Sequence, residues 1–191
     1  MEISSIRIYL LCGLIFHKAV WEVMKARQGA RAVKPARAPM ARLLAAVKIG
    51  VLVAILAQTL APEVLPIAAD PFALRMTGLV LYTLGLATAV TGRIQLGWNW
   101  SDIEQAHVKR GHALVSHGLY RFVRHPIYTG DLLLLLGLEL SLNSWCVLAA
   151  AALAVYIRRR AIREEGQLRQ ALPGYDQYCS RTTRFLPFLP V

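Results

Sequence analysis

Long apolar stretches alternate with short polar ones along most of the chain, and five of them approach the roughly 20 residues that a helix needs to cross a bilayer. They cover residues 3–23, 43–61, 74–96, 127–140 and 144–157. The last two are shorter than a full span and are separated by the sequence SLNS, which favours a tight helical hairpin. The pattern predicts an all-α polytopic membrane protein with five transmembrane helices.

The whole chain is expected to form a single integral membrane domain. Residues 1–95 would hold the first three spans, and residues 96–191 would form a more polar core together with the last two. The first apolar stretch has no basic segment before it and no clear small-residue cleavage site, so we predict a first span rather than a removable signal. In the third stretch, Gly85 and Gly92 lie seven residues apart and permit close helix packing.

Composition and charge support the membrane assignment. The 191 residues are 56% hydrophobic and 17% charged, which is too apolar for an ordinary soluble domain. The formal net charge of +11 would suggest nucleic acid as the partner of a soluble protein, but here the basic residues cluster between apolar stretches. Residues 24–42 carry six lysines and arginines, whereas residues 62–73 carry none. We therefore expect membrane lipids rather than nucleic acid as partners, with the N-terminus outside and the C-terminus cytoplasmic. The alanine and arginine bias suggests a bacterial inner membrane.

Cysteine and histidine spacing gives no sign of a metal or disulfide framework. The three cysteines are far apart in the sequence. His112, His117 and His125 have no cysteine or carboxylate at a matching short spacing, and the chain contains no HExxH motif. No metal site is predicted.

Two polar stretches on the predicted cytoplasmic side are longer than simple connections. They are residues 99–126 and residues 158–190, and both contain many aromatic and apolar side chains. Long connections are usually either functional or disordered, and this composition disfavours disorder. We therefore expect the functional site in these two stretches.

The sequence RHPIY at residues 124–128 combines several features of an anion site. Pro126 lacks an amide hydrogen and suits the first turn of a helix, whereas His125 before it is disfavoured in helical geometry. The fourth span is predicted to begin at Pro126, with its unpaired amides and positive dipole end facing Arg124 and His125. Arg124 adds a planar fork suited to a carboxylate or phosphate, and Tyr128 can reach the same place. Taken alone, Arg124 could instead anchor to lipid head groups.

A second group of polar residues follows the fifth span. The span is predicted to continue as a cytosolic helix that ends at Pro173-Gly174. Glu164 and Glu165 stand together on it and could form weak surface ion pairs with Arg160 or Arg169. Beside an anion site, a carboxylate supplies the opposite charge, so the two groups together could hold a zwitterion.

The order of these features resembles the superfamily of isoprenylcysteine carboxyl methyltransferases and phospholipid methyltransferases, which are integral membrane enzymes. The likeness covers residues 96–187 and rests on GHALVSHGLYRFVRHPIYTG, a helical hairpin, and REEGQLRQALPGYDQYCSRTTRFLP. One departure is LPGY, which stands where many relatives have a Phe-Gly turn. The resemblance implies S-adenosylmethionine as cofactor, enclosed by the cytosolic loop and tail, and a lipophilic substrate that enters from the bilayer. Residues 96–191 would then be a cofactor-binding methyltransferase core.

The resemblance also implies roles for particular residues. The nucleoside would be held near His112 and the methionine part near Tyr120 and His125, with Glu164 or Glu165 close to the ammonium or ribose. The implied cofactor-binding residues are His112, Leu114, Val115, Gly118, Tyr120, His125, Tyr128, Glu164 and Glu165. Arg124 and Arg181 or Arg184 would suit an acidic substrate group, and the resemblance does not separate the arginines that contact the cofactor from those that contact the substrate. We predict Glu165 and Arg124 as catalytic residues, with Glu165 as the available base for an amine acceptor, and Arg181 and Arg184 as substrate-binding residues.

Other functions are compatible with parts of the pattern. Membrane sterol and steroid reductases share a related C-terminal arrangement but use NADPH, and they would need more basic residues and usually a longer chain. A non-catalytic membrane scaffold would bind no cofactor at all. A transporter is disfavoured because, apart from Lys48 and Glu139, the spans carry few ionisable groups. The acceptor is left open between an isoprenylated carboxylate, a lipid amine, a thiol and an isoprenoid-like small molecule.

Overall fold

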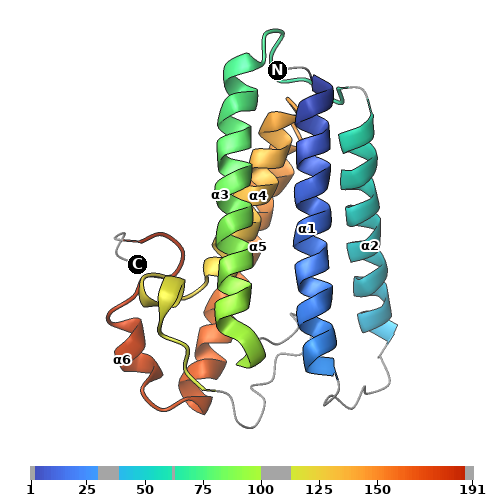
Figure 1. Ribbon diagram of the computed structural model, residues 1–191. Helices are drawn as coiled ribbons and strands as arrows, with labels where there is room; N and C mark the ends of the chain where they lie inside the picture. The colour runs from blue at the N-terminus through green and yellow to red at the C-terminus, as the bar shows by residue number, and fades with distance from the viewer. Residues whose placement is uncertain (1–2, 30–38, 62, 100–112, 188–191) are drawn as a thin grey trace.

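The computed structural model describes residues 3–29, 39–61, 63–99 and 113–187 of the chain. These residues form α-helices and two short 3-10 helices, with two isolated β-bridges and no β-strand among them. The α-helices are α1 (Ile3–Gly29), α2 (Pro39–Leu60), α3 (Phe72–Leu96), α4 (Pro126–Ser141), α5 (Val147–Ala171) and α6 (Tyr175–Cys179), and the 3-10 helices are η1 (Gly97–Asn99) and η2 (Gly118–Arg121). The predicted all-α class is confirmed (Figure 1).

Each of the five predicted spans falls on one of the helices α1 to α5, although the helix bounds differ from the apolar runs. Helix α1 continues past the predicted end of the first span, to Gly29. The predicted cytosolic helix is continuous with the fifth span, because α5 runs to Ala171 and ends just before Pro173. Within the described ranges, α1 and α3 are long and apolar enough to cross a membrane by length and composition. A five-span arrangement therefore stays a prediction.

Helices α3 and α4 form the most extensive contact in the fold, because glycines line the surface between them. A Cβ atom added at Gly85 would lie 2.2 Å from the backbone nitrogen of Leu134. One added at Gly137 would lie 2.2 Å from the backbone nitrogen of Tyr82. The helices therefore touch through their backbones, which the seven-residue spacing of Gly85 and Gly92 permits. We call this contact the glycine seam.

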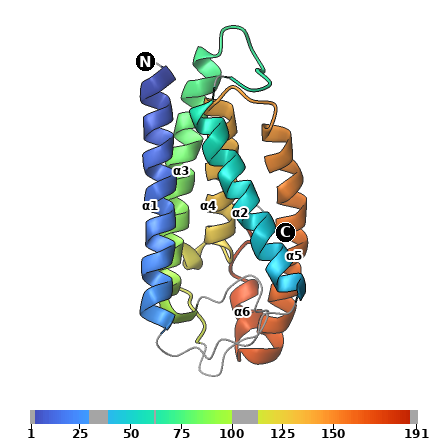
Figure 2. The same ribbon diagram turned by 90° about the vertical axis from the view of Figure 1, so that its right-hand side faces the viewer.

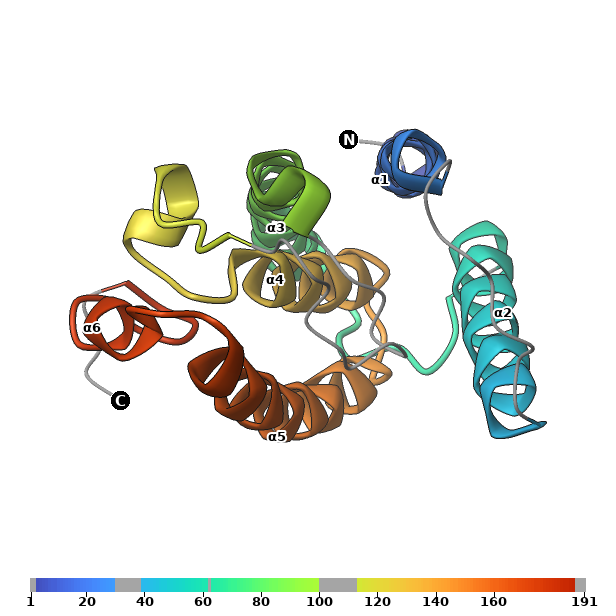
Figure 3. The same ribbon diagram turned by 90° about the horizontal axis from the view of Figure 1, so that it is seen from below.

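Helix α4 lies between α3 and α5, and α1 and α2 stand to one side (Figure 3). Helix α1 contacts α3 through Ile6 and Leu10, which belong to the buried cluster around Tyr82. The Tyr82 hydroxyl donates a hydrogen bond of 2.6 Å to the carbonyl of Leu10. Figure 2 shows the long axis of α2 crossing in front of α4. These contacts make the antiparallel pair of α3 and α4 the centre of the molecule.

A polar network holds the turn between α4 and α5 at one end of the bundle. Asn143 occupies this turn with φ of 57° and donates hydrogen bonds to Glu63 Oε2 (3.0 Å) and to the carbonyl of Ala68 (2.9 Å). Its side-chain oxygen accepts from the amides of Ile67 and Ala68. The predicted hairpin at SLNS is therefore present. It is fixed by contacts to the connection between α2 and α3.

The opposite end of α4 is where the two long polar stretches meet. Pro126 and Ile127, at the start of α4, pack against Gly92 near the end of α3. Figures 1 and 3 show η2 and α6 together on the side where α4 begins. Val123 and Thr183 form a parallel β-bridge there. The fold thus brings the segment before α4, the end of α5 and the C-terminal tail into one place.

Candidate functional site

The site is built around the N-terminus of α4. The helix begins at Pro126, as predicted, and His125 before it has φ of −126° and ψ of 58°, outside helical geometry. No side chain caps this end of the helix. The amides of Ile127 and Tyr128 are in the first turn, where a helix offers them no carbonyl partner. This end therefore presents hydrogen-bond donors and the positive end of the helix dipole to whatever lies beside it.

The C-terminal tail is joined to the segment before α4 by backbone hydrogen bonds. The amide of Arg124 donates to the carbonyl of Thr183 at 2.8 Å, and the amide of His125 donates to the carbonyl of Arg184 at 3.1 Å. In return, the amide of Thr183 donates to the carbonyl of Phe122 at 3.2 Å. This pairing places Arg184 next to His125, although the two residues lie far apart in the sequence.

Glu165 is the centre of a buried group of charges that we call the Glu165 cluster, made of Arg124, His125, Glu165 and Arg184. Its Oε1 atom accepts from Arg124 Nε at 2.9 Å and is 3.2 Å from His125 Nε2. Arg184 donates to both carboxylate oxygens, from Nε and Nη2, each at 2.9 Å. The Glu165 side chain is 1% exposed. Two arginines and a histidine therefore surround one buried carboxylate.

The electrostatics of this cluster keep Glu165 ionised. Burial by itself would raise the pKa of the carboxyl group, but hydrogen bonds from His125, Arg184 and Arg124 outweigh burial and hold the pKa well below its usual range. A carboxylate held in this way is a weak proton acceptor at neutral pH. The geometry favours a positioning role for Glu165 over the role of base for an amine acceptor that we expected from the sequence.

Arg124 is bound by protein atoms and not by solvent. Besides Glu165, its Nη1 atom donates to the carbonyls of Cys179, at 3.2 Å, and of Thr182. The residue is 8% exposed. The alternative in which Arg124 anchors to lipid head groups does not fit this burial, because a snorkelling guanidinium keeps its charged end in water. Of the two arginines weighed as surface partners of the glutamates, Arg169 pairs with Asp176 at 3.0 Å.

Tyr128 and Glu164 form a second, more accessible pair beside the cluster. The Tyr128 hydroxyl donates to Glu164 Oε2 at 2.8 Å. The ring of Tyr128 stacks on His125, with centroids 5.3 Å apart and an interplanar angle of 12°. Glu164 is only partly buried. This carboxylate, unlike Glu165, can accept further hydrogen bonds from a ligand.

Tyr120 and Gly118 fix the loop that covers this end of the bundle. Tyr120 is buried and its hydroxyl donates to the carbonyl of Gly92 at 3.3 Å, while Tyr178 donates to the carbonyl of Tyr120 at 2.7 Å. Burial raises the pKa of both phenols, so they stay protonated. Gly118 has φ of 60°, and a Cβ there would lie 2.3 Å from the side chain of Gln95. Tyr120 and Gly118 therefore both hold this loop against the end of α3.

The other predicted site residues lie at the edges of this arrangement. Leu114 and Val115 are half-buried in an irregular segment before η2. Arg181 is exposed and does not join the Glu165 cluster. His112 falls outside the described residues. Within those residues, no group of three or more histidine, cysteine or acidic side chains could hold a metal ion.

One polar pair was missed by the sequence reasoning. His17 of α1 and Asp131 of α4 lie 3.0 Å apart, between Nε2 and Oδ1, inside two stretches predicted to span the membrane. The sequence analysis singled out Lys48 and Glu139 as ionisable residues within spans. The same criterion, an ionisable side chain inside an apolar stretch, would have found both members of this pair.

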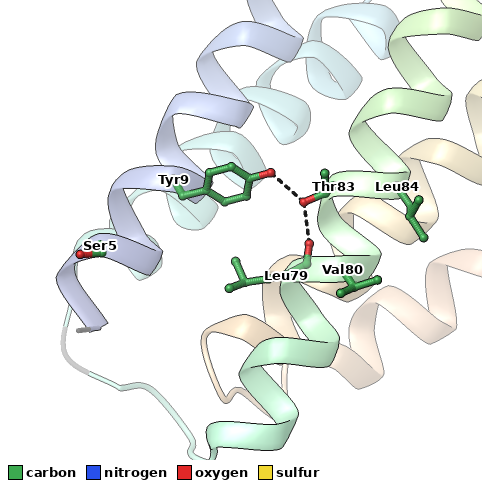
Figure 4. Close-up of a pocket in the computed structure, with 6 residues that line it drawn as sticks. All are labelled: Ser5, Tyr9, Leu79, Val80, Thr83 and Leu84. Carbon is green, nitrogen blue, oxygen red and sulfur yellow. Dashed lines mark hydrogen bonds between the residues drawn. The ribbon is translucent and has the colours of Figure 1, made fainter. Parts of the chain in front are cut away.

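A groove between α1 and α3 lies away from the Glu165 cluster. Its volume is about 490 Å³, and it is lined by Ser5, Tyr9, Leu79, Val80, Thr83 and Leu84 (Figure 4). The Tyr9 hydroxyl and Thr83 Oγ1 are 2.7 Å apart at one side of it. This part of α3 packs against the end of α4 near Gly137 and Ser141, whereas the cluster is at the other end. The lining is almost wholly apolar and carries no charged group.

Comparison with known proteins gives a consistent result. A family model described as phospholipid methyltransferase matches residues 74–172, just over half of the chain. A probable protein-S-isoprenylcysteine O-methyltransferase from Oryza sativa subsp. indica is 29% identical over 115 residues, which cover 59% of this chain and 60% of that protein. The cobalt-zinc-cadmium resistance protein CzcN of Cupriavidus metallidurans is 34% identical over 113 residues, which cover 58% of this chain and 50% of that protein. The chain thus aligns with at most about 60% of the length of these relatives.

A solved structure shares the fold. The eukaryotic intramembrane Ras methyltransferase, isoprenylcysteine carboxyl methyltransferase, superposes with a TM-score of 0.65 at 23% sequence identity. The alignment covers 98% of this chain and 67% of that protein. The similarity therefore includes α1 and α2, which lie before the match to the family model.

Proposed function

This chain belongs to the phospholipid methyltransferase family, and from that premise we propose that it is an integral membrane enzyme. The proposed reaction is transfer of a methyl group from S-adenosylmethionine to a lipophilic acceptor at the cytosolic face of the membrane. The observation that carries the proposal is the Glu165 cluster with the Tyr128–Glu164 pair beside it. Segments 124–128, 164–165 and 182–184 meet there around one uncapped helix end.

The residues present fit the cofactor chemically. S-adenosylmethionine carries an amino-acid carboxylate and ammonium, and when bound it supplies an electrophilic methyl group on a sulfonium. The N-terminus of α4, with the amides of Ile127 and Tyr128, suits the carboxylate. Glu164 is partly exposed and has capacity for the ammonium or for ribose hydroxyls. Leu114, Val115 and Gly118 supply backbone for the nucleoside next to the segment that contains His112.

The Glu165 cluster is proposed to hold these parts in register. Arg124 and Arg184 are both committed to Glu165, so their role is to join α4, α5 and the tail. Methyl transfer from a sulfonium depends chiefly on in-line positioning and exclusion of water. A rigid junction of this kind would hold the residues around the cofactor in fixed positions, as in-line transfer requires. Arg181, which is exposed nearby in the tail, is the arginine best placed to meet an acidic group on a substrate.

The proposed membrane arrangement places the five helices α1 to α5 across the bilayer, with the cluster on the cytosolic side. The distribution of lysine and arginine supports this orientation, with the N-terminus outside and the C-terminus cytoplasmic. The short helix α4 then begins within the cytosolic half of the bundle. Such a position would let the head of a lipophilic acceptor meet the cofactor while its apolar part stays in the membrane.

The proposal is tested by calorimetric titration of the detergent-purified protein with S-adenosylhomocysteine and, in parallel, with NADPH. We expect saturable binding of S-adenosylhomocysteine alone. Glu164→Gln should weaken it at least tenfold because it removes the charge that faces the ammonium. The matched control is Glu22→Gln, which alters an exposed glutamate of α1 paired with Lys18 and should leave the affinity unchanged.

The other outcomes separate the alternatives. Binding of NADPH in place of S-adenosylhomocysteine would move the protein to the membrane reductases. Binding of neither ligand would support a non-catalytic scaffold. Equal affinity of the wild type and Glu164→Gln would remove Glu164 from the cofactor site while leaving the cofactor class intact.

A further inference from the structure

His17 of α1 and Asp131 of α4 form a polar pair between two helices, and on α1 the pair lies next to the exposed Lys18–Glu22 ion pair. His17 Nε2 lies 3.0 Å from Asp131 Oδ1, and the imidazole stacks on Trp21 with centroids 4.0 Å apart and an interplanar angle of 24°. The side chains are 22% and 39% exposed, respectively. The imidazole is therefore oriented from two sides, and a small polar group can still reach the pair.

The pair borders the proposed reaction site on its membrane side. Asp131 follows Tyr128 by three residues on α4, and side chains at this spacing are neighbours on the helix surface, with about 5–6 Å between their Cβ atoms. Tyr128 in turn contacts His125 and Glu164. An acceptor that reaches the cofactor from the bilayer would pass the first turns of α4. On that path the acceptor would meet His17 and Asp131 next to Tyr128.

A purely structural tie explains this pair less well than a functional one. Ionisable side chains inside membrane spans are costly and mark functional positions far more often than ordinary packing. Helix α1 is already attached to α3 by two neutral hydrogen bonds, from Tyr82 to the carbonyl of Leu10 and between Tyr9 and Thr83. A neutral pair would serve equally well as a third tie. A histidine held by a carboxylate adds a capacity to take up a proton.

We infer that His17, oriented by Asp131, is the catalytic base for a protic acceptor, and this inference rests on the proposed methyl transfer. In the required tautomer, the Nε2–H group of His17 donates to Asp131 and Nδ1 is free to accept. A lone pair on the acceptor atom X forms the new bond to the methyl carbon, while the electron pair of the bond between that carbon and the sulfonium goes to sulfur and leaves a neutral thioether. The proton of X passes to His17 Nδ1, the electron pair of the X–H bond stays on X, and the carboxylate of Asp131 stabilises the resulting imidazolium.

The other carboxylates near the site are less suited to this task. Glu165 is enclosed by Arg124, His125 and Arg184 and is held ionised with all of its strong acceptor positions in use. Glu164 receives the Tyr128 hydroxyl and faces the position assigned to the cofactor ammonium. His17 is unlike both because its one recorded hydrogen-bond partner within the described part of the chain is Asp131.

The test compares His17→Gln with the wild type, because glutamine keeps an N–H donor for Asp131 and cannot take up a proton. Turnover is measured with a lipophilic thiol and a lipophilic amine, which must lose a proton, and with a lipophilic carboxylate, which is already ionised. We expect kcat for a protic acceptor to fall about 10²–10⁴-fold, the usual contribution of a general base. Affinity for S-adenosylhomocysteine, and any turnover of the carboxylate, should not change.

Tyr9→Phe is the matched control for a structural tie. It removes the hydrogen bond to Thr83, another polar contact between α1 and a neighbouring helix, and it should leave kcat unchanged. Wild-type kcat in His17→Gln on every acceptor would overturn the inference, and so would a wild-type enzyme that methylates carboxylates alone. Failure of the wild type to bind S-adenosylhomocysteine would instead refute the proposed function from which the inference starts.

Discussion

At the scale of single residues, the negative charge of Glu165 balances the buried positive charges of Arg124 and Arg184. Glu165 supplies the only recorded carboxylate for Arg124 and Arg184 within the described ranges, and both guanidinium groups are largely buried. Removing one partner from a buried ion pair leaves the other charge without compensation, which costs more than the pair itself contributes. Loss of the Glu165 charge is therefore expected to lower the stability of the protein by much more than the loss of one hydrogen bond would.

We predict that Glu165→Gln lowers the free energy of unfolding by about 3–5 kcal/mol, as expected when a buried ion pair loses one partner. The adjacent Glu164→Gln should cost about 1 kcal/mol or less, because glutamine still offers Tyr128 a carbonyl oxygen. Apparent unfolding temperatures of the two variants in the same detergent provide the measurement. Equal effects at the two positions would contradict the difference in burial and pairing described above.

The lowered pKa of Glu165 also predicts a pH dependence. A carboxyl group whose pKa is lower in the folded protein contributes its full stability above the unfolded value, about 4.3 for glutamate, and loses it as the pH falls towards the native value. Wild-type unfolding temperature should therefore drop below about pH 4.3. In Glu165→Gln this component is absent, so the drop between pH 6 and pH 3 should be smaller. Parallel curves for the two proteins would refute this assignment.

At the scale of elements, the glycine seam sets how closely α3 and α4 approach. The atoms that face Gly85 belong to the backbone of α4, so they cannot turn aside as a flexible side chain could. The start of α4, and with it the first turn that faces the site, is placed by this contact. Backbone contact between helices is a common solution where the surrounding lipid offers no hydrophobic driving force.

We predict that Gly85→Ala destabilises the protein by at least about 1–3 kcal/mol, the usual cost of overpacking a tight contact. The added methyl carbon would lie 2.2 Å from the backbone nitrogen of Leu134. Gly50→Ala in α2 is the control, because a Cβ there meets nothing within 4 Å and alanine favours a helix. Thermal unfolding of both variants in detergent measures the effect, and a stable Gly85→Ala protein would show that the two helices can separate without loss.

The sequence was sufficient to predict the helices but not their partners. Apolar length located α1 to α5, and Pro126 located the start of α4, because both signals are local. The pairing of Arg124 with Glu165 joins residues 41 positions apart. No local rule selects Glu165 rather than a lipid phosphate as the partner of Arg124, or Arg124 rather than a surface arginine as the partner of Glu165. His17 and Asp131 are 114 positions apart. Their meeting depends on how α1 leans towards α4, which hydrophobic periodicity does not encode.

For the whole molecule, the distribution of basic residues predicts which end faces the cytoplasm. A reporter that is active only in the cytoplasm should work when fused to the C-terminus. One that is active only outside the cytoplasm should work when inserted after Asp70, in the connection that lacks lysine and arginine. Activities of paired fusions in a bacterial host provide the measurement. The reverse pattern would place the Glu165 cluster on the wrong side of the membrane for a cytosolic cofactor.

The backbone pairing between the tail and the segment before α4 also sets the order in which the site can form during synthesis. Arg124 and His125 leave the ribosome first, Glu165 follows after the α4–α5 hairpin, and Arg184 comes later still. Until Thr183 and Arg184 have emerged, the carbonyls that accept from the amides of Arg124 and His125 do not exist. A nascent chain can therefore insert both helices of the hairpin before its cluster closes. The Glu165 cluster can therefore close only after the whole α4–α5 hairpin has been synthesised.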